Sequence, residues 1–134
     1  MADIFKVEII TPDRVFYEGE GRFIEFTTMA GEIGVYANHI PMTTVLAPGV
    51  VTIHNGENKV IAAVHAGFAE VLGDKVTLLA EIAEWPDEID LSRAEAAKRR
   101  AEERISSHAA DIDVKRAELA LRKALTRIDI AGLK

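Results

Sequence analysis

The chain of 134 residues contains no cysteine, so it can form no disulfide and has no cysteine nucleophile. It also lacks any apolar run close to the roughly 20 residues that a membrane-spanning helix needs, which argues against direct membrane insertion. The opening residues, MADIFKVEII, lack the basic segment and the continuous apolar stretch of a secretory signal. These absences together favour a cytoplasmic setting.

Signatures of catalysis and of metal binding are also missing. The sequence has no G-x-S-x-G, no H-E-x-x-H, no Walker loop and no G-x-G-x-x-G. Tetrahedral metal sites usually show close ligand pairs, but the histidines stand at unrelated spacings: His39, His54, His65 and His108. We therefore expect no catalytic residue, no metal site and no catalytic cofactor. We also expect that this chain does not hydrolyse any nucleotide that it binds.

Charge is divided unevenly along the chain. Residues 1–90 hold 5 basic and 15 acidic side chains, a net charge of −10, whereas residues 91–134 hold 11 and 7, a net charge of +4. The acidic first part argues against nucleic-acid binding, because contacts with phosphate need a basic surface. The basic second part could attract an acidic partner, a phosphate ligand or the first part itself.

Up to about residue 83 the pattern is that of short strands separated by turns. The stretch RFIEFTT alternates with the period of two that a pleated strand requires. Asn55-Gly56 and Gly73-Asp74 each separate two strand-like runs, and the first pair suits a type I′ hairpin turn. This part therefore predicts an antiparallel β-sandwich of about eight to ten strands.

After Trp85-Pro86 the periodicity becomes helical. Apolar residues recur at intervals of three and four over residues 91–106 and again over about 112–130, with SSHAAD between them. The second stripe contains Val114, Ala117, Leu121, Ala124 and Ile128, and the first is rich in alanine. We predict an antiparallel helical hairpin and an α+β protein with two domains, a β-sandwich over residues 1–86 and a hairpin over 87–134.

A hairpin of two helices has little core of its own and must pack on another surface. Small residues in its seam provide little apolar area per turn. At about 25 cal/mol per Å² of buried apolar surface, docking on the sandwich would be weak enough to reverse. We therefore hypothesise that the hairpin is mobile.

Residues 31–49, GEIGVYANHIPMTTVLAPG, are the first candidate site. Their glycines and prolines predict a long irregular connection at one end of the sandwich. One interpretation is a structural loop with a surface Glu32 and His39. The other is a loop that contacts a partner, because Tyr36, Ile40 and Met42 are unusually apolar for a solvated loop.

The start of the first helix is the second candidate site. Asp90 can cap a helix that begins at Leu91, and Ser92 with Glu95 could form a capping box two residues later. Arg93 lies in the first turn, where its charge opposes the helix dipole unless an acid or an anion lies close by. The residues alone leave two interpretations open: Asp90 is a cap with a local ion pair, or the helix start holds a ligand.

These segments resemble the epsilon subunit of bacterial F-type ATP synthase, and the Bacillus-like members above all. The resemblance runs from KVEIITPDRVFYEGE through GEIGVYANHIP and LAPG to IDLSRAEAAKRRAEERI and DIDVKRAELALRKALTRI. It implies a rotor subunit that binds the gamma subunit and the ring of c subunits, couples proton flow to catalysis elsewhere and restrains ATP hydrolysis. It also implies a peripheral location on the cytoplasmic face of the bacterial membrane and no catalysis by this chain alone.

The resemblance implies site residues as well. Glu32 matches the acid that faces the c-ring loops, and His39 matches a residue at the gamma contact. The motif Ile89-Asp90-Leu91-Ser92-Arg93-Ala94 matches an ATP site on the folded hairpin, with ATP as a regulatory ligand and the need for Mg²⁺ left open. The implied nucleotide-binding residues are Glu84, Asp90, Arg93, Ala94, Arg100, Lys123 and Arg127. Arg122-Lys123 stands where Bacillus-like relatives have Lys-Arg.

We expect the hairpin to fold against the sandwich when ATP is bound and to extend along gamma toward the alpha and beta subunits of the catalytic head when it is not. An alternative within the family is a hairpin that inhibits through basic contacts with the head and does not respond to ATP. Outside the family, the alternative is a small-molecule-binding or adaptor domain with no rotary role.

Overall fold

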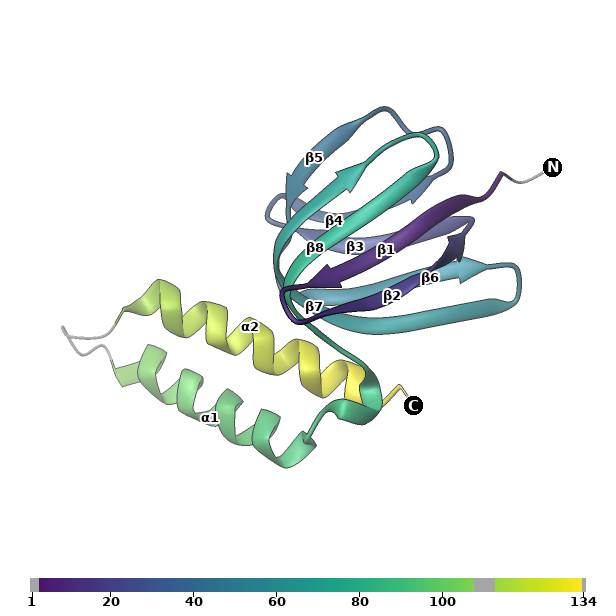
Figure 1. The fold of residues 1–134 in the computed structure, drawn as a ribbon. Coiled ribbons are helices and arrows are strands. Elements are labelled where there is room, and N and C mark those ends of the chain that lie inside the picture. The colour runs from purple at the N-terminus through teal and green to yellow at the C-terminus, as the bar shows by residue number, and fades with distance from the viewer. Residues whose placement is uncertain (1–2, 108–112, 134) are drawn as a thin grey trace.

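The structure is a computed structural model that describes residues 3–107 and 113–133. It contains eight strands, one short 3-10 helix and two α-helices in that order, so the predicted fold class is confirmed (Figure 1). The elements are β1 (Phe5–Thr11), β2 (Arg14–Gly21), β3 (Phe23–Thr28), β4 (Gly31–Tyr36), β5 (Met42–Val45), β6 (Gly49–Asn55), β7 (Asn58–Val71), β8 (Lys75–Glu84), η1 (Pro86–Glu88), α1 (Leu91–Ser107) and α2 (Val114–Ala131).

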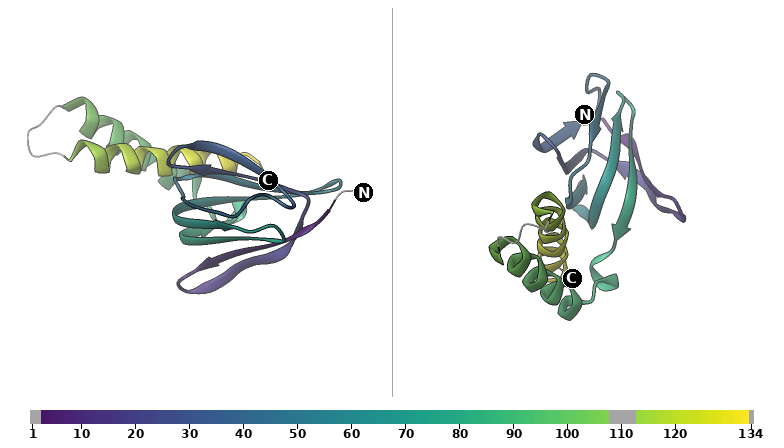
Figure 2. Two further views of the ribbon diagram at one scale, coloured as in Figure 1. Left: turned by 90° about the horizontal axis from the view of Figure 1, so that it is seen from above. Right: turned by 90° about the vertical axis from the view of Figure 1, so that its left-hand side faces the viewer.

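The strands surround one hydrophobic core. Hydrogen bonds connect them in the order β2-β1-β8-β7-β6-β3-β4, and β5 pairs with β7. All neighbours are antiparallel except β1 and β8, which run parallel. Inward side chains alternate along each strand and include the fully buried Ile9, Ile24, Phe26, Ile53 and Leu78. The sheet curls back on itself (Figure 2).

The long strand β7 bends in its middle. Its first half pairs with β6 and its second half with β5. Between the halves Ala66 has φ 58° and Gly67 has φ 114°. A Cβ at position 67 would collide with the carbonyl oxygen of Leu79, so this close approach requires glycine. The bend lets one strand contribute to both layers of the sandwich.

Both predicted hairpins form, but the first turn is shifted by one residue. Asn55 pairs with Asn58, so the turn residues are Gly56 and Glu57 rather than Asn55 and Gly56. Positive φ occurs only at the first of them, where Gly56 has φ 65°. That is the type II′ pattern, so the prediction of a type I′ turn was wrong.

Residues 31–49 do not form a long irregular connection, and that prediction was wrong. They contain β4 and β5, and β4 pairs with β3 along its full length. Gly34 does not break the strand; it leaves room for the ring of Phe23, which a Cβ at that position would meet at 2.6 Å. The irregular parts are two short links, one between Tyr36 and Met42, where Asn38 has φ 65°, and one between Val45 and Gly49.

The two helices end close to their predicted boundaries, although most of the predicted break between them lies outside the described residues. Their seam is made of small side chains: Ala94 and Ala101 on α1 and Ala117 and Ala124 on α2 are buried. Of the stripe predicted on α2, Ala117 and Ala124 are buried and Leu121 and Ile128 are half-buried, whereas Val114 is exposed. Alanine lets the helix axes approach closely, which leaves the longer side chains at the edges.

The hairpin is docked on the sandwich. α2 contacts β7 and β6, and it lies between α1 and the sheet (Figure 1). Ile130, near the end of α2, is fully buried. The link that connects the sandwich to α1 is short, because η1 follows β8 after a single residue.

Candidate ligand site between the sandwich and the helical hairpin

A hollow of about 280 Å³ opens where the end of β8, η1 and the two helices meet. It is lined by Glu84, Glu88, Ile89, Asp90, Arg93, Ala94, Ala97, Arg100 and Arg127. Arg127 comes from α2, whereas Glu84 ends the last strand of the sandwich. The hollow therefore exists in this form only while the hairpin is docked.

Glu84 connects the two parts of the molecule. Its Oε1 accepts one hydrogen bond from Nε of Arg127 at 2.7 Å and lies 3.0 Å from Nε2 of His65 on β7. Burial alone would raise the pKa of Glu84, but the hydrogen bonds from His65 and Arg127 and the positive charge of Arg127 outweigh burial and hold this pKa below its usual range. Glu84 is therefore an anion with partners in both domains.

The short helix η1 holds the start of α1 in place. Trp85 stacks on Phe16 of β2, with 4.2 Å between the ring centroids. The carboxylate of Glu88 forms a salt bridge with Arg14 at 3.1 Å and accepts a hydrogen bond from the backbone N–H of Trp85 at 2.9 Å. These contacts fix the side of the hollow from which α1 begins.

Asp90 caps α1. Its Oδ1 accepts a hydrogen bond from the backbone N–H of Arg93 at 3.1 Å, while Ser92 and Glu95 lie inside the helix. Of the two capping alternatives, the structure therefore has the one at Asp90. The carboxylate of Asp90 is bound to the backbone, and within residues 3–107 and 113–133 neither Arg93 nor Arg100 forms a salt bridge. Two guanidinium groups thus line the hollow without a carboxylate partner, which suits an anionic ligand.

Six of the seven residues predicted for a nucleotide site lie around this hollow: Glu84, Asp90, Arg93, Ala94, Arg100 and Arg127. Lys123 does not line it; it is half-buried on α2, one turn before Arg127. Ile89, the first residue of the predicted motif, lines the hollow as well. Sequence reasoning missed Glu88 and Ala97 as lining residues. No motif distinguishes these two, because their positions follow from the geometry of η1 and the first turns of α1.

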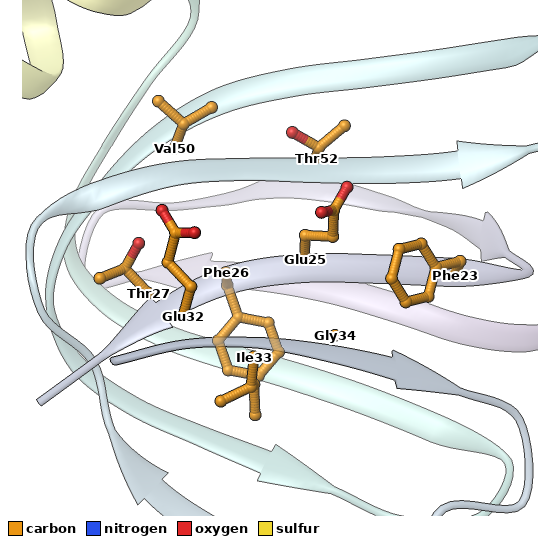
Figure 3. A pocket seen from close by; sticks show the side chains of 9 residues that line it. All are labelled: Phe23, Glu25, Phe26, Thr27, Glu32, Ile33, Gly34, Val50 and Thr52. Atoms are coloured by element: carbon orange, nitrogen blue, oxygen red, sulfur yellow. The ribbon is translucent and has the colours of Figure 1, made fainter. Parts of the chain in front are cut away.

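The other candidate site predicted from the sequence, around Glu32, forms a separate hollow of about 320 Å³. Figure 3 shows Glu32 of β4 and Glu25 of β3 pointing to the same side, beside Thr27 and Thr52. Glu25 is paired with His54 at 2.7 Å, whereas Glu32 forms no salt bridge among the described residues. Glu32 is therefore an exposed acid on the outer surface of the sandwich.

His39 lies apart from this hollow, in the link between β4 and β5. It is half-buried, and its Nδ1 lies 2.7 Å from the carbonyl oxygen of Ile40. Ile40 itself is 78% exposed. The structure thus leaves an apolar side chain in solvent beside the histidine.

A row of apolar side chains crosses the sheet, and the sequence reasoning missed it. Val15, Ile10, Leu79, Phe68 and Val45 are successive cross-strand partners from β2 to β5, and we call them the apolar band. Phe68 is 54% exposed and Leu79 is 48% exposed. Because the strands alternate normally, only the pairing reveals that these residues form one continuous surface.

Neither described helix combines the length and hydrophobicity that crossing a bilayer requires. The part of the chain that the structure describes also contains no group of three or more His, Cys, Asp or Glu side chains placed to hold a metal ion.

Comparison with known families accounts for both parts of the chain. Residues 4–86 match the β-sandwich domain of the ATP synthase delta/epsilon chain, and residues 87–132 match its long α-helix domain. The chain belongs to the ATP synthase epsilon family. It is 49% identical to the ATP synthase epsilon chain of Brevibacillus brevis over 93% of this chain and 96% of the relative. It is 44% identical to the ATP synthase epsilon chain of Caldanaerobacter subterraneus over 98% of this chain and 96% of that relative.

A solved structure shows the same fold. A chain of the Euglena gracilis mitochondrial ATP synthase, in a structure of OSCP, F1 and the c-ring, superposes with a TM-score of 0.81 at 24% identity, over 97% of this chain and 81% of that chain. The two family matches and the curated relatives confirm the resemblance found in the sequence, and this resemblance to the ATP synthase epsilon chain covers nearly the whole chain.

Proposed function

We propose that this subunit regulates the rotor through a hairpin with two positions, and that ATP favours the docked one. The observation that carries the proposal is the hollow beneath the docked hairpin. It brings Arg93 and Arg100 of α1 and Arg127 of α2 to one cavity beside the end of β8. A phosphate chain bound there would contact both helices and the sandwich together, so it would stabilise the docked arrangement. ATP is then a regulatory ligand, whether or not Mg²⁺ accompanies it.

The number of basic groups at the hollow fits the free energy that is needed to shift the hairpin from one position to the other. Shifting a two-state equilibrium from 1:99 to 99:1 takes about 5.5 kcal/mol of differential binding. A hydrogen bond to a charged group contributes about 1.5 to 3 kcal/mol, so about two to four such contacts must form only in the docked state. Three arginines line the hollow, and Lys123 is one turn away on α2.

The apolar band supports a rotor partner for the sandwich. A continuous row of exposed apolar side chains across five strands is unusual for an isolated soluble domain and typical of a protein contact. We assign this band, together with His39, to the gamma subunit. The exposed Glu32 is assigned to the polar loops of the c-ring, which would hold the subunit at the cytoplasmic face of the bacterial membrane.

In the extended position the hairpin would reach the alpha and beta subunits of the catalytic head and restrain ATP hydrolysis, while this chain itself performs no catalysis. The alternative is inhibition by basic contacts alone, without a response to ATP. Arg99, Arg116 and Arg122 favour it, because all three are exposed and form no salt bridge within the described ranges.

Calorimetric titration of the purified chain with ATP tests the proposal. Replacing both Asp90 and Arg93 by alanine removes the cap and a guanidinium at the hollow, so we expect ATP affinity to fall by about tenfold or more, since each charged hydrogen bond contributes about 1.5 to 3 kcal/mol. Unchanged affinity would refute ATP binding at this hollow and favour the alternative.

The chain offers a matched control at the start of α2. Asp113 caps that helix through the backbone N–H of Arg116 at 3.1 Å, with the same spacing as Asp90 and Arg93. Neither residue lines the hollow. The Asp113→Ala, Arg116→Ala double variant should therefore keep the original ATP affinity; an equal loss in both double variants would point to general weakening of the helices.

A further inference from the structure

His65 is buried on a side of β7 that the sandwich core does not cover. Residues 62–65 are all buried, although side chains alternate between the two faces of a strand. Ala62 and Val64 belong to the core, so Ala63 and His65 face the opposite side. Ala63 pairs with Glu84, which reaches Arg127 of α2 on that same side. The docked α2 is therefore what covers His65.

The hydrogen bonding of His65 leaves one ring nitrogen without a partner. Nε2 lies 3.0 Å from Oε1 of Glu84, whereas Nδ1 is buried and has no hydrogen-bond partner among the described residues. A neutral imidazole has one N–H, which Nε2 can donate to the carboxylate. A protonated imidazole would have a second N–H at Nδ1, buried with no acceptor, and that is costly.

Glu84 already has a positive partner while the hairpin is docked. From α2, Arg127 already donates to the same oxygen of Glu84, and Lys123 lies one turn away. On β6, Val50 is the partner of Ala63 and carries no charge. The remaining charged groups around the hollow are Glu88, Asp90, Arg93 and Arg100. Glu88 is paired with Arg14 and Asp90 caps α1, so neither supplies an acceptor for His65.

Departure of α2 changes the positive partners of Glu84. Glu84 then loses Arg127, and a proton on His65 can supply the missing positive charge within the sandwich. Nδ1 becomes accessible to water, which can accept its hydrogen bond. The carboxylate of Glu84 can therefore be neutralised either by a proton on His65 or by Arg127 of the docked α2, but not by both together.

We propose that His65 is a proton-operated latch, whose neutral form retains the docked hairpin and whose protonated form releases it. The latch rests on the two-position hairpin proposed above, but it does not depend on ATP. It would make the regulatory position of the hairpin respond to pH as well as to nucleotide.

The test measures hairpin position against pH in the full chain. Because the sequence has no native cysteine, Glu57→Cys in the β6–β7 turn and Glu118→Cys on α2 can carry a fluorescent donor and acceptor specifically. A histidine side chain in water gains its second proton at about pH 6.5. Because His65 takes up one proton when the hairpin leaves the sandwich, the equilibrium constant for docking should fall by up to about tenfold for each pH unit below that value. The same chain with His65→Gln should show no such fall.

His54 provides the matched control. It forms a similar imidazole–carboxylate pair with Glu25, yet among the described residues Glu25 forms no salt bridge with α2, so His54→Gln should keep the full pH response. The latch is wrong if His65→Gln responds to pH as the unsubstituted chain does. Should that variant fail to fold, NMR of the His65 ring in the labelled chain with the native His65 provides the test. The ring should gain its proton over the same pH range in which the hairpin leaves the sandwich. If the ring gains a proton and the distance between the labels does not change, the latch is wrong.

ATP added to the same samples separates the two proposals. At about pH 5.5, well below the histidine midpoint, saturating ATP should restore the docked distance. If ATP changes the distance but the His65 variant keeps its pH response, only the latch is wrong. If neither ATP nor pH changes the distance, both the latch and the two-position hairpin are wrong.

Discussion

Glu84 shows how a single carboxylate can join two domains. It occupies the last position of β8, and its Oε1 has His65 on one side and Arg127 on the other. Because its pKa is lower in the folded chain than in the unfolded chain, the unfolded chain takes up a proton at higher pH than the folded one does. The stabilisation is complete above the ordinary glutamate value of about 4.3 and is lost as pH falls through the lowered pKa.

Replacing Glu84 by glutamine should remove this acid-sensitive contribution. The melting temperature of the original chain should fall between about pH 5 and pH 3 by more than that of Glu84→Gln, since the variant has no carboxylate to protonate there. Glu81→Gln is the control, because Glu81 is exposed on the same strand and forms no salt bridge among the described residues. Equal acid sensitivity in Glu84→Gln and the original chain would contradict this role.

At the residue scale, the sequence indicated which side chains gather around the hollow, but it gave no indication of a role for His65. Most of the implied nucleotide residues lie around one cavity because the Asp90-to-Arg93 spacing and the i,i+4 spacing of a helix fix their faces. His65 carried no signal, since a lone histidine in a strand has no motif. Its importance depends on the register that places it beside Glu84 and under α2, and register follows from pairing over the whole sheet.

Among the elements, β7 does most to shape the molecule. Its bend at Ala66 and Gly67 divides its pairing between β6 and β5, and its first half also forms the surface on which α2 docks. The sequence predicted strand hairpins on both sides of β7 correctly. It could not predict the bend, because GFAEV continues the strand pattern without interruption.

The bend makes Gly67 the glycine most sensitive to substitution. Gly67→Ala must place a side chain at φ 114° against the backbone of Leu79, so we expect a loss of about 3 kcal/mol or more in the free energy of unfolding, measured by urea denaturation. Gly56→Ala also has positive φ but meets no atom within 4 Å, so it should cost only about 1 kcal/mol. If the two variants lose equal stability, the close approach at Leu79 is not a structural requirement.

At the scale of the whole molecule, a single salt bridge joins the acidic sandwich to the second helix of the basic hairpin among the described residues. Arg127 and Glu84 form this salt bridge, and the seam of the hairpin is largely alanine. The charge difference and the helical periodicity predicted a separate basic hairpin from the sequence. The side of the sheet that it covers could not be predicted, because that choice depends on β7 and η1 in three dimensions.

The most direct test of the two-position hairpin is the donor-to-acceptor distance between labels at Glu57→Cys and Glu118→Cys, measured in single molecules at neutral pH with and without ATP. Without ATP we expect two populations, one docked and one more distant. Saturating ATP should collapse them into the docked population, since ligand binding to one state alone shifts the equilibrium toward it. A single distance that stays the same in both conditions would contradict the account.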